Sequence, residues 1–488
     1  MIQMCPVASE NKNKEKNNLS DLKKLIKSSG IYFVGSVLSK TILFFMLPIF
    51  TRYLNPTEYG EYNLSQAYIV FFTLFFFFDI WVGIMRFILD KKNKVVENYK
   101  EKIIFSGFII FTISSILYII FFYIFMQIYG VKFKFLLMLT GLCTNLQTTY
   151  GYMCRAYEKN FIFALSGIIN TLIYAIVASS LLIFFKFSYE ALFIGITIGN
   201  LSSIALMESS LKVIQKLKVA FMEFYFFKKL LFYSLPFCLH CLAYWFADTY
   251  GRLVVATKLS LSANGYYAIA LNFGSIIGFL IICLNMGWQE ISFAKTLNKD
   301  QSTEFYSKAC NEYLKFLLLG TIVILPLINL IFPILVGAKF HRSLVYIPMT
   351  LFGSIVFGFS QFLTNIINAI NKNKFLFICT AAGAIINVTI LTLFIGKFGI
   401  LTAVSSTIIS YTFVCIVMIA LINKTFKISI NLKKLTYFVT FFCVQGYIMT
   451  KFGYIINIVA FCVSMTIFIF CYHKELKMIT DKIFQKFI

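Results

Sequence analysis

The residues that could carry chemistry in this chain of 488 residues are polar side chains inside long apolar segments. Lys40 is the clearest case, because it lies about twelve residues into an apolar run over 29–50. An ionisable side chain deep in a membrane costs about 2.5–3.5 kcal/mol on insertion scales, so few occur there without a ligand or a partner. In a watery cavity, the ammonium group of Lys40 could bind a phosphate or an acidic sugar. An ion pair with a carboxylate such as Asp79 is the alternative, and the two are compatible.

Two pairs of charged residues have spacings that place both members on one face of a helix. Asp79 and Arg86 are seven residues apart, which is about two turns. Arg86 could contact a ligand or extend to the membrane surface, whereas the deeper Asp79 could form a buried ion pair or bind a proton or a sodium ion. Asp248 and Arg252 are four residues apart, so an ion pair within the helix is the first expectation for them.

Uncharged and weakly basic residues supply a second kind of candidate. Gln361, Asn365 and Asn368 have the i, i+4 and i+7 spacing of a stripe on one helix face. Their amides provide the donors and acceptors that sugar hydroxyls need, and hydrogen bonding to a neighbouring helix is the alternative. His240 lies at the middle of another apolar segment, where hydrogen-bonded packing and a proton relay are both open.

Apolar helices must position these side chains. Hydrophobic residues make up 59% of the chain and charged residues 13%, against about 45–50% and 25% in soluble domains. Because one core cannot bury such an excess, lipid must surround it, and we predict an all-α integral membrane protein. Runs of about twenty apolar residues, enough to cross a bilayer, predict about 14 transmembrane helices. The segments are 29–50, 63–88, 103–127, 135–153, 161–185, 189–210, 231–256, 263–287, 312–336, 344–370, 375–396, 399–422, 435–450 and 454–472.

The distribution of Lys and Arg gives the orientation of these segments. If the N-terminus is inside and the segments alternate, the inside stretches hold 31 of the 44 Lys and Arg residues and the outside loops hold nine. This is the positive-inside pattern, so both termini are expected in the cytoplasm. The net charge of +24 then reflects the cytoplasmic loops, and no nucleic acid is expected as a partner.

A short internal repeat divides the segments into two sets. The connectors after the first and the seventh segment share Leu, Gly and Tyr at equal spacing, at positions 54, 60 and 62 and at positions 259, 265 and 267. The offset of 205 residues, with one slip, also sets Arg86 against Glu290. Six segments separate the connectors, so the two lobes would be parallel repeats. The predicted parts are a cytoplasmic tail (1–28), an N-lobe (29–210), a basic cytoplasmic linker (211–230), a C-lobe (231–422), two C-terminal helices (423–472) and a cytoplasmic tail (473–488).

The N-terminal segments carry a family resemblance. Residues 35–54, GSVLSKTILFFMLPIFTRYL, followed by EYGEY at 58–62, resemble the start of the Wzx-type flippases of the multidrug/oligosaccharidyl-lipid/polysaccharide exporter superfamily. Asp79, Gly83 and Arg86 at the end of the second segment fit the same pattern. The resemblance covers the whole chain by segment count and two-lobe layout, and its motifs weaken after about residue 300.

The resemblance implies two six-helix lobes about a central cavity and alternating access. It also implies that polyprenyl-pyrophosphate-linked oligosaccharide repeat units cross the bacterial cytoplasmic membrane, for O-antigen, capsule or another surface polysaccharide. The expected partners are this lipid-linked oligosaccharide, membrane lipid and other membrane proteins of polysaccharide assembly. Lys40 and Arg252 would hold the pyrophosphate, and Arg86, His240 and the amide stripe would line the cavity. The candidates for ion coupling or ion pairing are Asp79, Asp248 and Glu290.

Two other functions stay open at this stage. A drug/cation antiporter of the same superfamily would share the fold, although cations inside the segments favour an anionic cargo. A polysaccharide polymerase or ligase belongs to a different class and usually needs a large loop for its active site. With three His and neither an H-E-x-x-H motif nor a nucleotide-binding glycine loop, the chain is expected to be no enzyme and to hold no metal or cofactor.

Overall fold

The computed structural model describes residues 35, 37–89, 98–294, 299–370, 372 and 374–487. The predicted tail 1–28 lies outside them, as does the beginning of the predicted segment 29–50. Helices account for nearly all of the described chain, and no strand occurs in it. The prediction of an all-α protein is confirmed.

Ten helices in the described ranges are long and apolar enough to cross a membrane. The bent pair α2 (Pro56–Phe77) and α3 (Ile80–Leu89) makes an eleventh if it is one span. The predicted segments 135–153 and 435–450 correspond to the more polar α5 (Lys134–Ala156) and α16 (Leu432–Lys451). The chain is therefore a multi-pass membrane protein, and the count of fourteen stays a prediction. The ten helices are α4 (Tyr99–Ile128), α6 (Asn160–Ile183), α7 (Glu190–Leu211), α9 (Phe224–Asp248), α11 (Leu261–Ala294), α12 (Lys299–Leu335), α13 (Ile347–Ala369), α14 (Lys374–Phe398), α15 (Ile400–Asn423) and α17 (Tyr454–Phe487), with the span in α13 including the 3-10 helix η3 (Ala338–Tyr346).

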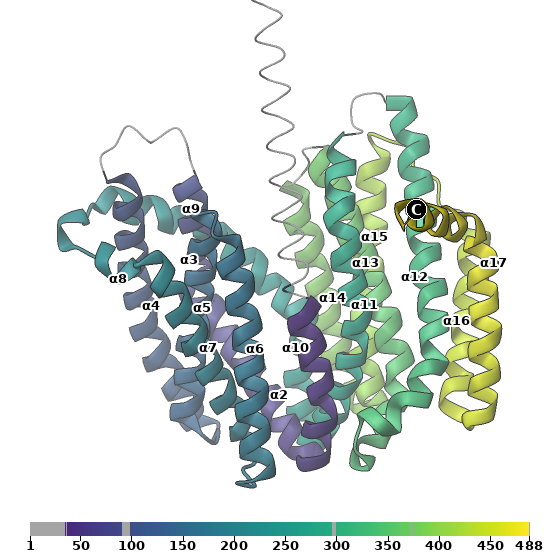
Figure 1. Cartoon of the computed structure of the whole chain (residues 1–488), viewed down its shortest axis with the longest axis horizontal. Coiled ribbons are helices and arrows are strands. Elements are labelled where there is room, and N and C mark those ends of the chain that lie inside the picture. Colours follow the sequence, from purple (N-terminus) through teal and green to yellow (C-terminus); the bar gives the residue numbers. More distant parts are fainter. Residues whose placement is uncertain are drawn as a thin grey trace, which may run out of the picture. The chain divides into compact units, whose positions relative to one another are not determined.

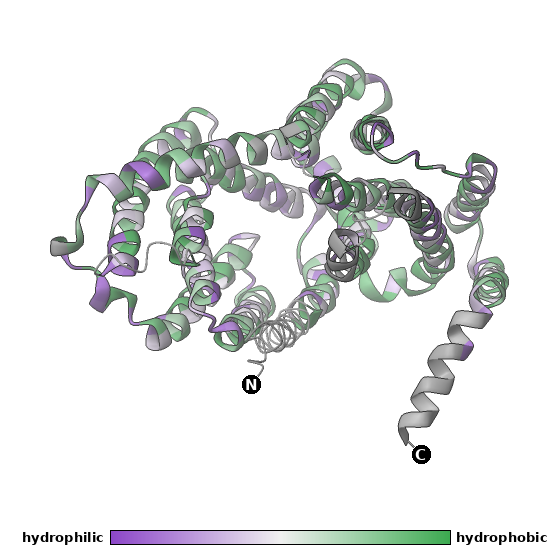
Figure 2. Ribbon diagram, turned by 90° about the horizontal axis from the view of Figure 1, so that it is seen from above, coloured by the Kyte–Doolittle hydropathy of each residue, from purple (hydrophilic) through white to green (hydrophobic). Residues whose placement is uncertain are grey.

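Many large apolar side chains on these helices point outward. Phe121 on α4 is 51% exposed, and Ile455 and Phe470 on α17 are each 79% exposed. Figure 2 shows hydrophobic residues along the greater part of the helical ribbon. In water such surfaces would be unfavourable, so these faces are the ones that contact lipid.

The helices form two compact units. The N-terminal unit contains the described residues up to Met46 together with 72–238, and in it α7 packs against α5 and α6, and α3 against α4 and α5. The C-terminal unit contains 47–71 and the described residues from Leu239 onward. In it α13 packs against α11 and α15, and α12 packs against α16 and α17, as can be followed in Figure 1.

The linker between the predicted lobes is partly helical. It contains the one-turn helix α8 (Val213–Lys216) and the 3-10 helix η2 (Val219–Phe221), and α9 begins at Phe224. The apolar helix thus starts seven residues before the predicted 231–256 segment. The division between the units falls after Cys238, inside α9.

The predicted segment 63–88 is not one straight helix. α2 and α3 meet at an angle of 51°, and the residues between them, Phe78 and Asp79, have φ of 52° and 49°. Two successive residues with left-handed backbone conformation end the helical hydrogen bonding. For residues with a side chain, this conformation costs energy that glycine would not pay. The prediction that Asp79 and Arg86 share one face of a continuous helix is therefore wrong.

The repeated connectors begin equivalent helices. α2 starts at Pro56 and α11 starts at Leu261, which is the predicted offset of 205 residues. A Cβ atom added to Gly60 would lie 1.8 Å from the Leu261 carbonyl oxygen, and one added to Gly265 would lie 2.0 Å from the Pro56 carbonyl oxygen. Each glycine thus lets the backbone of the other helix approach. The two connectors meet in the C-terminal unit, at equivalent positions, with Asn264 Nδ2 donating to the Gly60 carbonyl at 2.9 Å.

A second contact holds the beginning of the first connector. The buried Thr51 hydroxyl donates to the Leu47 carbonyl at 2.8 Å and accepts from the Gly337 backbone N–H at 2.9 Å. The second of these bonds joins residues 286 positions apart in the chain. It anchors the end of the first helix to the loop that follows α12.

Substituting Thr51 with Val should destabilise the C-terminal unit. The methyl groups keep the side-chain shape, but the Gly337 N–H loses its acceptor, and leaving a buried donor unpaired costs about 1–3 kcal/mol. We expect a lower midpoint of thermal unfolding for the purified protein in detergent. The matched control is Thr112→Val, because the exposed Thr112 hydroxyl bonds only the Phe108 carbonyl of its own helix. Equal midpoints for the two variants would contradict this role of Thr51.

Candidate functional site

Lys40 lines a cavity of about 220 Å³ in the N-terminal unit. The cavity lies between the first helix, of which 37–53 is described as helical, and the helices α5 and α6. Gln147 of α5 is its other long polar side chain. A cavity below the roughly 300–1,000 Å³ of typical small-molecule sites fits a phosphate group or a single sugar ring, not a whole oligosaccharide. Its lining residues are Gly35, Ser39, Lys40, Gln147, Phe163, Ala164 and Gly167.

Small residues position Lys40 in this cavity. A Cβ atom on Gly35 would lie 3.0 Å from the Cβ of Ala164, so the first helix and α6 approach closely at this point. Gly167 lies one turn further along α6, opposite Ser39. Close packing of small residues is a common way for membrane helices to associate. Here it brings the backbone around Lys40 to the edge of α6 and leaves the long side chain to line the remaining space.

A chain of hydrogen bonds lies behind this cavity, among α5, α6 and α7. Asn170 donates to Asn200 at 2.8 Å, and Asn200 donates to the Thr144 hydroxyl at 2.9 Å. Gln147 Nε2 donates to the Ser203 hydroxyl at 3.5 Å, which ties the cavity residue to α7. Asn170, Asn200 and Thr144 were not among the predicted site residues, although an asparagine inside an apolar segment is the signal that would have found the first two.

A second, smaller cavity lies in the C-terminal unit and contains Asp248. Its volume is about 80 Å³, room for two or three waters at about 30 Å³ each. It can hold waters or a cation and has no room for a sugar ring. The polar residues that line it are Asp248, Tyr267, Thr350, Ser354, Thr407 and Tyr411.

The chain around Asp248 is interrupted. α9 ends at Asp248 and α10 (Tyr250–Lys258) begins after Thr249. Asn387 of α14 is buried and donates to the carbonyl groups of Phe246 and Ala247, each at 3.0 Å. The last carbonyls of α9 thus have a partner from another helix, which holds Asp248 at the cavity. Asn387 was not among the predicted site residues.

Asp248 and Arg252 do not form the ion pair that their spacing suggested. Among the described residues no carboxylate lies within 4.0 Å of the Arg252 guanidinium, and Arg252 Nε is buried without a hydrogen bond. Nearby, Asn272 of α11 donates to the hydroxyl of the buried Tyr59 at 2.9 Å. Two opposite charges thus lie in one part of the C-terminal unit without neutralising each other by contact.

The amide stripe of α13 is present. Gln361, Asn365 and Asn368 are all partly exposed, whereas Phe362 and Ile366 on the other face are buried. Within the described part of the chain, none of the three amide side chains has a hydrogen-bond partner. The alternative of interhelical hydrogen bonding therefore finds no support, and the three amides are available to a ligand.

The other predicted site residues are dispersed. Asp79 is buried at the break before α3, and Arg86 is exposed in the last turn of that helix. His240 and Glu290 belong to α9 and α11, but their side chains lie outside the described residues. The structure brings Lys40 together with Gln147 in the N-terminal unit, and Asp248 together with Tyr267 and Tyr411 in the C-terminal unit.

Comparison with known proteins gives a family match and several structural likenesses. The family model described as "Polysaccharide biosynthesis protein" matches residues 25–288. No curated protein matches the chain.

Three solved structures illustrate the likeness of fold. A lipid II flippase MurJ in an inward closed conformation aligns with a TM-score of 0.68 at 17% identity, over 91% of this chain and 99% of that one. An inward-facing multidrug resistance MATE family transporter of the MOP superfamily gives 0.63 at 11% identity, over 83% and 95%. A mutant of the MATE transporter VcmN of Vibrio cholerae gives 0.54 at 12% identity, over 81% and 94%. At these identities the likeness establishes the fold and not the cargo.

Proposed function

This chain belongs to the family of polysaccharide biosynthesis proteins, and from that membership we propose that it is a flippase for lipid-linked sugars. The proposed cargo is a polyprenyl-pyrophosphate-linked oligosaccharide repeat unit, moved across the bacterial cytoplasmic membrane by alternating access. The product would enter O-antigen, capsule or another surface polysaccharide. Family membership carries the proposal, and the fold shared with a lipid II flippase supports it.

The charge of the candidate site supports an anionic cargo. Lys40 lies on the first predicted membrane helix and lines a cavity, so its exposed ammonium group offers a positive charge to an anion there. A pyrophosphate supplies that anion, and a charge-assisted hydrogen bond to its oxygens is about twice as strong as a neutral one. The cavity volume of about 220 Å³ suits a phosphate group. We assign Lys40 and Gln147 to the pyrophosphate or to the first sugar.

Two further groups of candidate residues have roles of their own in the proposal. The amides of Gln361, Asn365 and Asn368 would bind sugar hydroxyls, since they offer donors and acceptors without a protein partner among the described residues. The small cavity around Asp248 would take a coupling proton or cation, because its size of about 80 Å³ excludes a sugar. Both termini would lie in the cytoplasm, and other membrane proteins of polysaccharide assembly would be partners.

Deletion of the gene tests the proposed function. A flippase mutant should lose surface glycan and accumulate lipid-linked repeat units on the cytoplasmic side, because the substrate is made but not moved. Both are measured by glycan staining and by mass spectrometry of extracted lipids, with the plasmid-borne wild-type gene as the control.

The same experiment separates the alternatives. Normal surface glycan with a changed tolerance to cationic drugs would establish the antiporter that the MATE-like fold also allows. Single, unpolymerised repeat units displayed at the cell surface, seen in the glycan staining, would identify a polymerase. Either result would overturn the flippase.

A further inference from the structure

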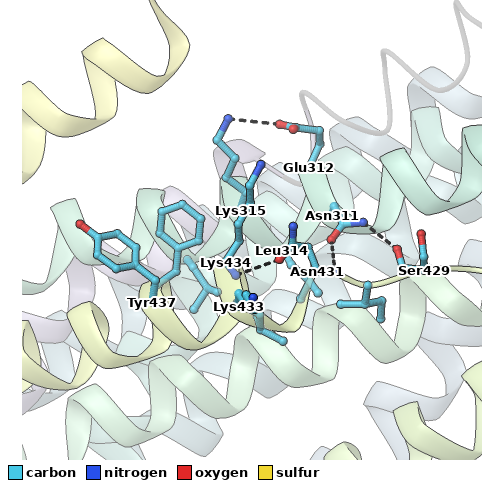
Figure 3. Close-up of a pocket in the computed structure, with 13 residues that line it drawn as sticks. Asn311, Glu312, Leu314, Lys315, Ser429, Asn431, Lys433, Lys434 and Tyr437 are labelled. Atoms are coloured by element: carbon cyan, nitrogen blue, oxygen red, sulfur yellow. Dashed lines mark hydrogen bonds and ion pairs between the residues drawn. The ribbon is translucent and has the colours of Figure 1, made fainter.

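The largest cavity among those described in the C-terminal unit contains none of the predicted site residues. It measures about 780 Å³ and lies between the middle of α12, the linker before α16 and the beginning of α16. Figure 3 shows its three lysines, its two asparagines and Tyr437 around one opening. The cavity is lined by Asn311, Glu312, Leu314, Lys315, Leu318, Ser429, Ile430, Asn431, Lys433, Lys434, Leu435, Tyr437 and Phe438.

Hydrogen bonds fix one wall of this cavity. Asn311 of α12 donates to the Ser429 carbonyl at 2.9 Å and accepts from the Asn431 backbone N–H at 2.9 Å. The Ser429 N–H donates to the Ser307 hydroxyl at 3.1 Å. These bonds hold the linker against α12, so the beginning of α16 has a defined position relative to α12. A wall that is held by hydrogen bonds within the protein lowers the entropic cost of binding a ligand.

The charge of the cavity is positive. Lys315 contacts Glu312 at 3.4 Å and lies over the ring of Tyr472, 4.6 Å from its centre. Lys433 and Lys434 have no ion-pair partner among the described residues. The Lys434 backbone N–H is already bonded to the Asn431 side chain at 3.1 Å, so the ammonium groups are the available donors. Three lysines face one carboxylate, which leaves room for an anion.

The cavity also has the apolar surface of a lipid site. Leu314, Leu318, Leu435 and Phe438 line it beside the lysines, and the exposed Tyr437 lies one turn after Lys433. Both α12 and α16 change from polar to apolar sequence at this level, so the cavity marks a membrane boundary. Tyrosine is enriched there, and the positive-inside pattern makes this the cytoplasmic side.

We propose that this cavity binds an anionic phospholipid of the cytoplasmic leaflet. Lys315, Lys433 and Lys434 would hold its phosphate, while its acyl chains would lie against the leucines and Phe438. Basic pockets between membrane helices on the cytoplasmic side are known to bind such head groups. The bound lipid would join α12 to α16, the first of the two C-terminal helices. It is a site apart from the cavity of Lys40 and does not depend on the cargo.

Binding of defined lipids to the purified full-length protein tests this site. Native mass spectrometry in detergent would measure retention of phosphatidylglycerol and of phosphatidylcholine with identical acyl chains. We expect the wild type to prefer phosphatidylglycerol. The double variant Lys433→Gln/Lys434→Gln should bind it about 30-fold more weakly, since each lysine near an anionic lipid contributes about 1 kcal/mol.

The matched control removes the same charge from the linker just before α16. Lys424 and Lys427 are exposed and do not line the cavity, so Lys424→Gln/Lys427→Gln should change the affinity less than about twofold. An equal loss in both double variants, or no preference of the wild type for phosphatidylglycerol, would overturn the proposal. So would competition by inorganic phosphate or polyprenyl pyrophosphate at least as strong as by phosphatidylglycerol. If Lys433→Gln/Lys434→Gln does not fold, Lys315→Gln replaces it, with the same expected direction.

Discussion

Replacing Gly265 with alanine is expected to disrupt the contact between the two repeated connectors and to abolish function. The new Cβ atom would lie 2.0 Å from the Pro56 carbonyl oxygen, whereas real Cβ atoms essentially never come closer than 3.0 Å to such an atom. The backbone fixes the position of the new Cβ, and the Pro56 oxygen is itself a backbone atom, so no side chain can rotate away. Overpacking costs about 1–3 kcal/mol and occasionally more, and we expect a loss at the upper end of this range.

Two measurements and a control within α11 make the Gly265 prediction specific. Thermal unfolding in detergent should show a lowered midpoint, and surface glycan should be lost in cells. Gly278→Ala is the matched control, because an added Cβ there meets nothing within 4 Å. Alanine in a helix is favoured over glycine by about 1 kcal/mol, so this control should keep or raise the midpoint. If Gly265→Ala has the wild-type midpoint and export, the contact of the connectors is not required.

Substituting Lys40 with alanine is expected to abolish export while the protein remains in the membrane. Among the described residues that line the cavity of about 220 Å³ in the N-terminal unit, Lys40 is the cation that the change removes, and packing should not be disturbed, because the Lys40 side chain is exposed. Losing a hydrogen bond to a charged group costs about 1.5–3 kcal/mol, which is roughly a ten- to 150-fold loss of affinity for the anionic head group.

Surface glycan and membrane-bound protein are measured together for the Lys40 variants. Lys40→Arg should recover part of the export, since the charge is kept. The control Lys258→Ala removes an exposed lysine at the end of α10 and should export normally. Full export by Lys40→Ala, with normal amounts of protein, would remove Lys40 from the site and leave the proposed function standing on family membership.

The internal repeat predicted equivalent helices but not the contact between them. The equal spacing of Leu, Gly and Tyr in the two connectors predicted equivalent positions, and α2 and α11 do begin 205 residues apart. The spacing did not indicate that Gly60 and Gly265 pack against each other's helices. Two equal segments can lie far apart or in contact, and only the packing of all helices determines which of the two occurs.

Helix spacing was a weaker guide to the charged residues. Asp248 and Arg252 are four residues apart, but the helix is interrupted between them and no ion pair forms in the described structure. Asp79 and Arg86 are separated by a bend of 51°. Such spacing rules hold for a continuous helix. Asn387, which binds the last carbonyls of α9, lies about 140 residues away in the chain. A rule based on the spacing of residues within one helix cannot predict such a contact.

The sequence by itself determined the class of this protein and the polar residues that need an explanation. Hydrophobic excess and the alternation of positive charge are properties of local segments, so they do not depend on how the helices pack. Tertiary structure alone decided which polar groups share a cavity. Lys40 meets Gln147, and Asn311 bonds Asn431 across 120 residues, because helices distant in the chain pack side by side. Because a site forms only through that packing, the sequence could indicate candidate residues but not which of them lie together.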